Sequence, residues 1–248
     1  MSDWGWPRLI VHRCGGALAP ENTLAGLGIA ARLGCAAVEF DVMLSGDGVP
    51  VLIHDATLDR VAGRPGQVSR LAADELLATD VGCCFHPAFS GETIPGLEAA
   101  LLRCRQLGLS ANLEIKPAAG FEVETGRVVG SFLAAAHSAG LPPLLLSSFS
   151  AQALEAAALE VEALPRAFLA TRFDAQALAT ARRLACVSLN LGRCDLQAAH
   201  VAAVRDAGLR TLVYTVNSPE EARRLAGWGV SGVFSDRPEL LLPDCSVP

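Results

Sequence analysis

Two short apolar segments each carry a pair of charged residues two positions apart. Glu39 and Asp41 lie in AVEFDVML, and Glu114 and Lys116 lie in ANLEIKP. Because successive side chains of a strand alternate between its faces, residues at i and i+2 point the same way. An unpaired carboxylate in such an apolar run would be expensive to bury. The pattern therefore predicts a compensating positive charge, and a divalent cation is the simplest candidate.

Two histidines, His12 and His54, offer a base and an acid that titrate near neutral pH. The three carboxylates come without a Cys/His ligand cluster, so they favour a hard, oxygen-preferring ion, Mg²⁺ or Ca²⁺. Once such an ion is counted together with Arg13 and Lys116, the predicted site has a small positive charge. A monoanionic ligand such as a phosphodiester would neutralise it.

Plainer interpretations of the same residues stay open at this point. Either histidine alone is more often a hydrogen-bonded core residue than a catalytic one. Glu39 and Asp41 could form an internal salt-bridge network with basic residues, which we rate near parity with a metal site. Lys116 could be a Schiff-base lysine, although the neighbouring carboxylates favour an electrostatic role.

Apolar runs typical of strands alternate with Ala-rich segments of helical spacing. We expect strands at Arg8–His12, Ala37–Leu44, Ala111–Ile115, Leu144–Ser147, Arg166–Ala170, Val187–Asn190, Thr211–Val216 and Gly232–Ser235. We expect helices at Thr23–Leu33, Leu97–Leu107, Val123–Ala139, Ala151–Ala158, Ala175–Leu184, Leu196–Ala207 and Pro219–Ala226. This alternation implies parallel strands, and eight such units in 248 residues fit a closed (β/α)8 TIM barrel.

One further apolar run, Val49–Ile53, follows the turn signal Gly46-Asp47-Gly48. We expect it to fold back on the second strand as a hairpin, with His54 at its far end. The segment from about 56 to 95 is rich in Gly and Pro and holds one short helical piece around Ala72–Leu77. It predicts a small insertion after this hairpin, within a single barrel domain spanning 1–248.

The composition limits the classes of partner. A net charge of -6 and a pI near 5.4 argue against a nucleic-acid surface or an electrostatic membrane anchor. The sequence holds no apolar run of the roughly 20 residues that a membrane span needs, and its start does not have the order of a secretion signal. We therefore expect a cytoplasmic protein with reduced cysteines. The apolar composition would tolerate a homodimer.

Polar residues recur where the predicted strands end. In β/α barrels chemistry collects at the carboxyl ends of the strands, so these residues are candidates for one site. The set comprises His12-Arg13, Glu39 and Asp41, Glu114 and Lys116, Ser147-Ser148, Asn190, Asn217 and Asp236.

Several spaced motifs in this order resemble the glycerophosphodiester phosphodiesterase family over nearly the whole chain, with the cytoplasmic bacterial enzymes most similar. The motifs are HRCGGALAPENTLAG from His12, VEFDVMLSGDGVPVLIHDATLDR from Val38, NLEIKP from Asn112, LLSSF from Leu145, VYTVN from Val213 and FSD ending at Asp236. The resemblance implies a β/α barrel with a small insertion after HD. It also implies metal-dependent hydrolysis of glycerophosphodiesters to sn-glycerol 3-phosphate and an alcohol.

The resemblance carries roles to individual residues. His12 and His54 would be the acid/base pair, in an order that stays open, and Glu39, Asp41 and Glu114 would hold one divalent cation. Arg13 and Lys116 would contact phosphate, with Phe149 and Asn217 near the substrate. Attack by water and attack by the substrate's own glycerol hydroxyl, which would give a cyclic phosphate, are equally open.

The chain departs from the family at Cys14, where glycine usually follows the HR pair. If that position needs a positive φ, the cysteine is strained there, unless Gly15-Gly16 absorbs the turn. Two other functions remain as alternatives: a related barrel that cleaves lysophospholipid or sphingomyelin head groups, and a barrel that binds phosphodiesters without catalysis. The intact histidines and carboxylates argue against the second, because a binding protein needs no acid/base pair.

Overall fold

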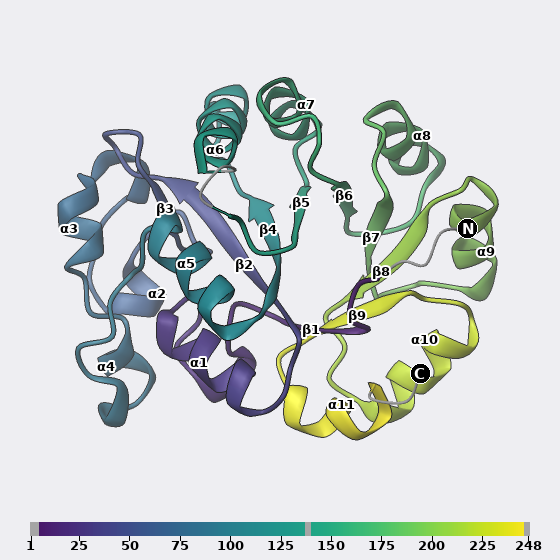
Figure 1. Ribbon diagram of the computed structural model, residues 1–248, viewed down its shortest axis with the longest axis horizontal. Coiled ribbons are helices and arrows are strands. Elements are labelled where there is room, and N and C mark those ends of the chain that lie inside the picture. The colour runs from purple at the N-terminus through teal and green to yellow at the C-terminus, as the bar shows by residue number, and fades with distance from the viewer. Residues whose placement is uncertain (1–4, 137–139, 246–248) are drawn as a thin grey trace.

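A computed structural model describes residues 5–136 and 140–245. Its eight parallel strands follow the order β1-β9-β8-β7-β6-β5-β4-β2, and pairing of β1 with β2 closes the ring. Figure 1 shows the helices arranged around the outside of these strands. The predicted (β/α)8 barrel is confirmed.

The observed elements follow the predicted ones closely. The strands are β1 Leu9–Val11, β2 Ala37–Leu44, β3 Pro50–Leu52, β4 Ser110–Ile115, β5 Leu144–Ser148, β6 Arg166–Ala170, β7 Ser188–Gly192, β8 Arg210–Tyr214 and β9 Gly232–Ser235. The helices of the outer ring are α1 Leu24–Arg32, α5 Leu97–Leu107, α6 Glu122–Ala136, α7 Ala151–Glu160, α8 Ala175–Arg183, α9 Ala198–Asp206, α10 Pro219–Gly227 and α11 Pro238–Cys245. The predicted helix end at 137–139 lies outside the described residues. Helix α11 was not predicted from the sequence; it is short and contains two prolines.

The two faces of β2 explain why its charges lie at the barrel interior. Phe40, with Val38 and Val42, belongs to the large apolar core between the strands and the outer helices. Residues at odd positions face the other way, and Ala37 belongs to a separate apolar cluster. Because side chains alternate, Glu39 and Asp41 must then point inward as well.

The predicted hairpin is present: β3 pairs antiparallel with β2, with Leu52 opposite Val42 and Pro50 opposite Leu44. The insertion then contains α2 Asp59–Ala62, α3 Ala73–Leu77 and α4 Gly82–Phe85, with short 3-10 turns between them. The predicted helical piece at Ala72–Leu77 is confirmed as α3. The two four-residue helices were missed because one turn is too short to show helical periodicity.

The insertion has its own small apolar cluster, which joins it to the hairpin. Met43 of β2 and Val51 of β3 pack in this cluster with insertion residues such as Leu58 and Leu76. Figure 1 shows α2, α3 and α4 together on one side of the barrel, next to α1 and α5. The insertion is thereby fixed to the edge of the barrel mouth on the side of β2.

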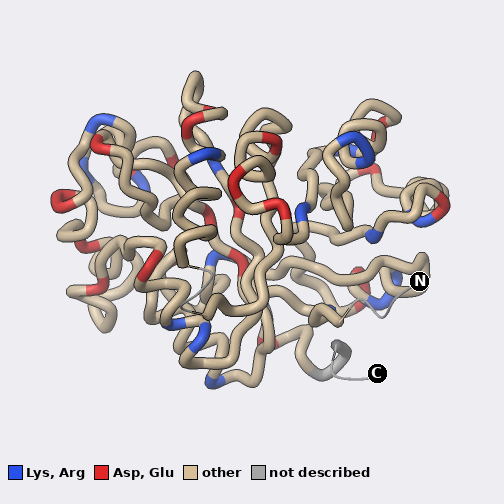
Figure 2. The backbone as a smooth tube through the Cα atoms, turned by 45° about the horizontal axis from the view of Figure 1, so that its top comes forward, with Lys and Arg blue, Asp and Glu red and all other residues tan. Residues whose placement is uncertain are grey.

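Figure 2 shows acidic and basic positions interspersed along the chain. None of the helices within residues 5–136 and 140–245 combines the length and the apolar character required to traverse a bilayer.

Candidate active site

An apolar layer fills the barrel, and a polar layer lies above it. The apolar side chains come from six strands: Ile10, Ala37, Leu145, Ala167, Leu212 and Phe234. Two positions further along five of these strands, on the same face, stand polar residues: His12, Glu39, Ser147, Tyr214 and Asp236. The strand period therefore collects the polar residues at the carboxyl end of the barrel, above a packed floor.

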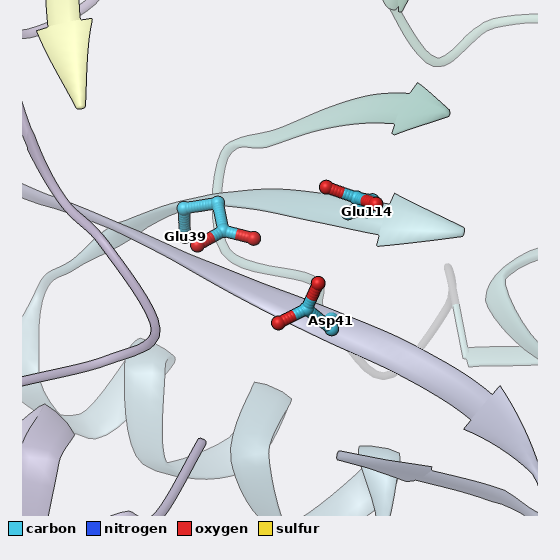
Figure 3. Close-up of side chains that lie close together, drawn as sticks. All are labelled: Glu39, Asp41 and Glu114. Carbon is cyan, nitrogen blue, oxygen red and sulfur yellow. The ribbon is translucent and has the colours of Figure 1, made fainter. Parts of the chain in front are cut away.

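Three carboxylates meet between β2 and β4. The strand register places Asp41 opposite Glu114, and Glu39, two residues before Asp41, opposite Asn112. One oxygen from each of the three lies within 4.8 Å of the other two. Figure 3 shows Glu39, Asp41 and Glu114 grouped over these two strands. Ligand oxygens lie about 2.0–2.6 Å from Mg²⁺ or Ca²⁺, so this spacing suits a single ion.

Burial makes this cluster electrostatically costly. Burial, and then the charges of Asp41 and Glu114, raises the pKa of Glu39 well above its usual range. Burial and the charge of Asp41 likewise raise the pKa of Glu114 to about 8. Asp41 differs: although burial opposes it, Lys116, His54 and a hydrogen bond from Asn22 lower its pKa. The cluster thus has more negative charge than its basic neighbours compensate.

An internal salt-bridge network explains only part of this cluster. Lys116 Nζ lies 3.1 Å from Asp41 Oδ1, and Asn22 Nδ2 donates to Asp41 Oδ2 at 2.9 Å. In contrast, Glu39 Oε1 and Glu114 Oε1 are buried and find no hydrogen-bond partner among the described residues. Buried acceptors without donors are expensive, and a cation satisfies them. The donor set therefore fits the expected metal ion.

Both histidines are oriented by an aspartate. His12 Nδ1 lies 2.7 Å from Asp236 Oδ1, and His54 Nδ1 lies 2.6 Å from Asp55 Oδ1. Since a carboxylate only accepts, each neutral imidazole carries its proton on Nδ1 and keeps Nε2 free. Burial lowers the pKa of His54, which favours its neutral form.

The histidines share a cavity of about 170 Å³ with the carboxylate cluster. Of the residues predicted to contact substrate, Arg13, Lys116 and Phe149 also line this cavity. Arg13 Nε is buried and lies 3.9 Å from Asp41 Oδ2, but it has no hydrogen-bond partner within the described part of the chain, so it can still donate to a ligand. The Phe149 side chain packs edge-to-face on Tyr214, with ring centroids 5.9 Å apart.

Asn217 lies on an adjoining cavity of about 550 Å³, between the barrel rim and the insertion. Its side chain is engaged with the end of β9. Asn217 Oδ1 accepts from the backbone N–H of Asp236 at 2.8 Å, and Nδ2 donates to Asp236 Oδ2 at 3.1 Å. It holds the aspartate that orients His12, while its contact with substrate stays a prediction.

Sequence reasoning did not assign roles to several residues that support this site. Asn22 donates to Asp41, Asp55 holds His54, and Glu21 pairs with both Arg13 and Arg60. Asp236 was a candidate from the sequence, and the structure places it on His12. The signal lies in the sequence, since Glu21 and Asn22 belong to the PENT part of the first motif. The same segment also begins a helix. Thr23 caps α1, because its side-chain oxygen accepts from the N–H of Gly26.

The turn at Cys14 corrects one expectation. Gly15-Gly16 does not absorb the turn, because Cys14 itself has φ of 72° and Arg13 has φ of 50°. Glycine tolerates this left-handed region, whereas a side chain makes it costly. The turn is fixed by the N–H of Cys14, which donates to the carbonyl of Glu39 at 2.7 Å, and by the N–H of Arg13, which donates to Glu39 Oε2 at 2.8 Å. Burial also raises the pKa of the Cys14 thiol, which argues against a nucleophilic role.

The fold and the site together define a class: β/α-barrel enzymes that place two aspartate-bound histidines beside a buried carboxylate cluster. Residues 12–240 match the Glycerophosphoryl diester phosphodiesterase family. The chain belongs to this family of phosphodiesterases.

Individual relatives cover nearly the whole chain. YhdW of Bacillus subtilis is 30% identical over 242 residues, which are 95% of this chain and 97% of that protein. A glycerophosphodiester phosphodiesterase of Caldanaerobacter subterraneus subsp. tengcongensis is 28% identical over 94% of this chain and 96% of its own length. Among solved structures, a phosphodiesterase of Oleispira antarctica in complex with the product sn-glycerol-3-phosphate has a TM-score of 0.91 at 33% identity, covering 97% of both chains.

Proposed function

We propose that this chain hydrolyses glycerophosphodiesters to sn-glycerol 3-phosphate and an alcohol, with one divalent cation held by Glu39, Asp41 and Glu114. The observation that carries the proposal is the pair of buried, unpartnered glutamate oxygens in the same cavity as two aspartate-bound histidines. The proposal includes a small-molecule substrate and either Mg²⁺ or Ca²⁺ as the ion. It also includes action in the cytoplasm.

The cation, when bound, supplies Lewis-acid stabilisation of negative charge on the phosphoryl oxygens. The chain's own residues bind and orient the diester. Arg13, through its free Nε, and Lys116 pair with the phosphoryl oxygens. Phe149 and Tyr214 form an apolar wall against the carbon skeleton of the substrate.

The two histidines move the protons. His54 is favoured as the base, because burial lowers the pKa of its imidazole and the bond of Nδ1 to Asp55 leaves Nε2 as the acceptor. His54 Nε2 accepts the proton of the attacking hydroxyl while the new P–O bond forms. His12 acts from its imidazolium form: its Nε2 gives a proton to the leaving alkoxide as the other P–O bond breaks, and the ring is left neutral with Nδ1–H on Asp236. Asp55 and Asp236 stay ionised and stabilise the imidazolium forms.

The attacking hydroxyl belongs either to water or to the glycerol of the substrate. Following the reaction by ³¹P NMR distinguishes them, since internal attack passes through a cyclic glycerophosphate and attack by water does not.

The direct test incubates purified protein with glycerophosphocholine and either Mg²⁺ or Ca²⁺ and assays glycerol 3-phosphate. Product formation that stops with a chelator and resumes with the ion supports the proposal. No product with either ion would instead favour a phosphodiester-binding barrel. A parallel reaction with lysophospholipid tests the related lipid head-group activity, and a clear preference for that substrate would contradict the assignment.

A further inference from the structure

An arginine of the insertion joins two separate parts of the active site. Arg60, on α2, donates through Nε to Asp55 Oδ2 at 2.7 Å. Its two terminal nitrogens donate to Glu21, at 2.6 Å from Nη1 to Oε2 and 2.8 Å from Nη2 to Oε1. All three nitrogens of one planar guanidinium are therefore used, on carboxylates 34 positions apart in the sequence.

Each carboxylate in turn holds a residue of the cavity. Asp55 uses its other oxygen, Oδ1, to hold His54 Nδ1 at 2.6 Å. Glu21 accepts from Arg13 Nη1, at 3.2 Å to each of its oxygens. The result is one continuous chain of hydrogen bonds from His54, through Asp55, Arg60 and Glu21, to Arg13.

The charges along this chain balance, with two carboxylates against two guanidinium groups. Although burial opposes it, hydrogen bonds from Arg60 and then from His54 lower the pKa of Asp55 to about 2. Burial alone would raise the pKa of Glu21. The hydrogen bond from Arg60, followed by the charges of Arg13 and Arg60, lowers it instead. Both carboxylates are thus kept ionised and accepting, which fixes the tautomer of His54 and the direction of Arg13.

We propose that Arg60 is a positioning residue, through which the insertion sets the geometry of His54 and Arg13 at once. This inference rests on the proposed function. Arg60 does not line the cavity of about 170 Å³ that holds the carboxylate cluster; it lines the adjoining cavity and acts through Asp55 and Glu21. A lysine cannot replace it, because one ammonium group cannot make three hydrogen bonds in a planar fork to both carboxylates.

The location of Arg60 makes a chemical test possible. Its side chain is 49% exposed and lines the open cavity of about 550 Å³. In an Arg60→Ala variant, free guanidinium can therefore enter from solvent and occupy the vacated position between Asp55 and Glu21. A suitable control is Arg64→Ala, since Arg64 lies in the same insertion, is 39% exposed and pairs with Glu75 and Thr79, away from both cavities.

The experiment measures kcat and KM with Mg²⁺ or Ca²⁺, for glycerophosphocholine and glycerophosphoethanolamine. We expect kcat/KM of Arg60→Ala and Arg60→Lys to fall by roughly ten- to a hundredfold, the usual range for partners that orient a functional imidazole. The loss is the same for both substrates, and guanidinium chloride restores part of the activity of Arg60→Ala but not of Arg60→Lys. Arg64→Ala stays within about twofold of the parent protein.

A second readout needs neither metal nor turnover. In ¹⁵N-histidine NMR of the parent protein, the signals of His54, assigned with His54→Gln, should show a single form protonated on Nδ1. In Arg60→Ala we expect a mixture of tautomers, because Asp55 can turn towards water, and guanidinium should restore the single form.

Three results would overturn the inference while leaving the proposed function intact: an unchanged kcat/KM in Arg60→Ala, unchanged His54 signals, or a loss confined to one of the two substrates. The last would make Arg60 a contact of the leaving alcohol instead. A parent protein that fails to hydrolyse either substrate would contradict the proposed function, and the NMR signals of His54 would still test the inference.

Discussion

Removing one charge from the carboxylate cluster should stabilise the metal-free protein. Glu114 is 12% exposed, its Oε1 has no hydrogen-bond partner in the described residues, and burial together with Asp41 raises its pKa from 4.5 to about 8. Between these two values the folded state binds more protons than the unfolded state, so stability falls as pH rises from about 4.5 to about 8. Glu114→Gln keeps the shape of the side chain and abolishes this loss.

The size of the effect follows from the shift in pKa. Raising the pKa of Glu114 from 4.5 to about 8 lowers the free energy of unfolding by roughly 5 kcal/mol once the group is fully ionised. The loss is about 4 kcal/mol at pH 8 and about 1.5 kcal/mol at pH 5.5. For a chain of this length, the variant should melt roughly 8–16 °C above the parent at pH 8 and roughly 3–6 °C above it at pH 5.5.

Differential scanning fluorimetry in EDTA, over pH 5.5–8, measures this difference. Adding Mg²⁺ or Ca²⁺ should raise the melting temperature of the parent protein strongly and that of Glu114→Gln weakly, because the variant lacks a ligand. Glu162→Gln, at an exposed loop glutamate, is the matched control and should show no pH-dependent gain. A Glu114→Gln protein that is less stable than the parent in EDTA at pH 8, or a gain that does not change with pH, would refute the reasoning.

Substitutions at four further residues test other parts of the site. His12→Ala and His54→Ala should each lower kcat by about 10²–10⁴-fold. Both variants should still bind Mg²⁺ or Ca²⁺ in a calorimetric titration, and a variant that no longer binds the ion would identify its histidine as a metal ligand. Cys14→Gly should keep activity and thermal stability. Cys14→Val should lower the free energy of unfolding in urea by about 1–3 kcal/mol, because a β-branched residue is strained at φ of 72°. Equal stability of the two variants would show that the backbone relaxes. Asn217→Ala should lower kcat on the order of tenfold by releasing Asp236, and an effect on KM alone would make Asn217 a direct substrate contact.

Much of the fold could be predicted because its signals are local. Alternating strand and helix patterns predicted every barrel strand and the seven helices that connect them, α1 and α5 to α10. The Gly46-Asp47-Gly48 turn predicted the hairpin. Helices α2 and α4 could not be predicted, since four residues show no periodicity. Val61 and Ala62 of α2 pack against the apolar cluster of the insertion, which includes Met43 of β2 and Val51 of β3, and Val81 of the same cluster directly precedes α4.

By itself, the sequence determined which strand faces carry chemistry: the two-residue period placed Glu39 beside Asp41 and Glu114 beside Lys116, and the spaced motifs indicated the family. Only the tertiary structure decided which charges are compensated. Lys116 donates to Asp41 and lies only 3.9 Å from Glu114 Oε1, so Oε1 of Glu39 and of Glu114 receives no hydrogen bond from the described residues. Arg60 joins Glu21 to Asp55 across the insertion. The physical reason is that a strand's periodicity fixes the direction of a side chain, whereas its partners come from segments that meet only when the barrel closes and the insertion packs against it.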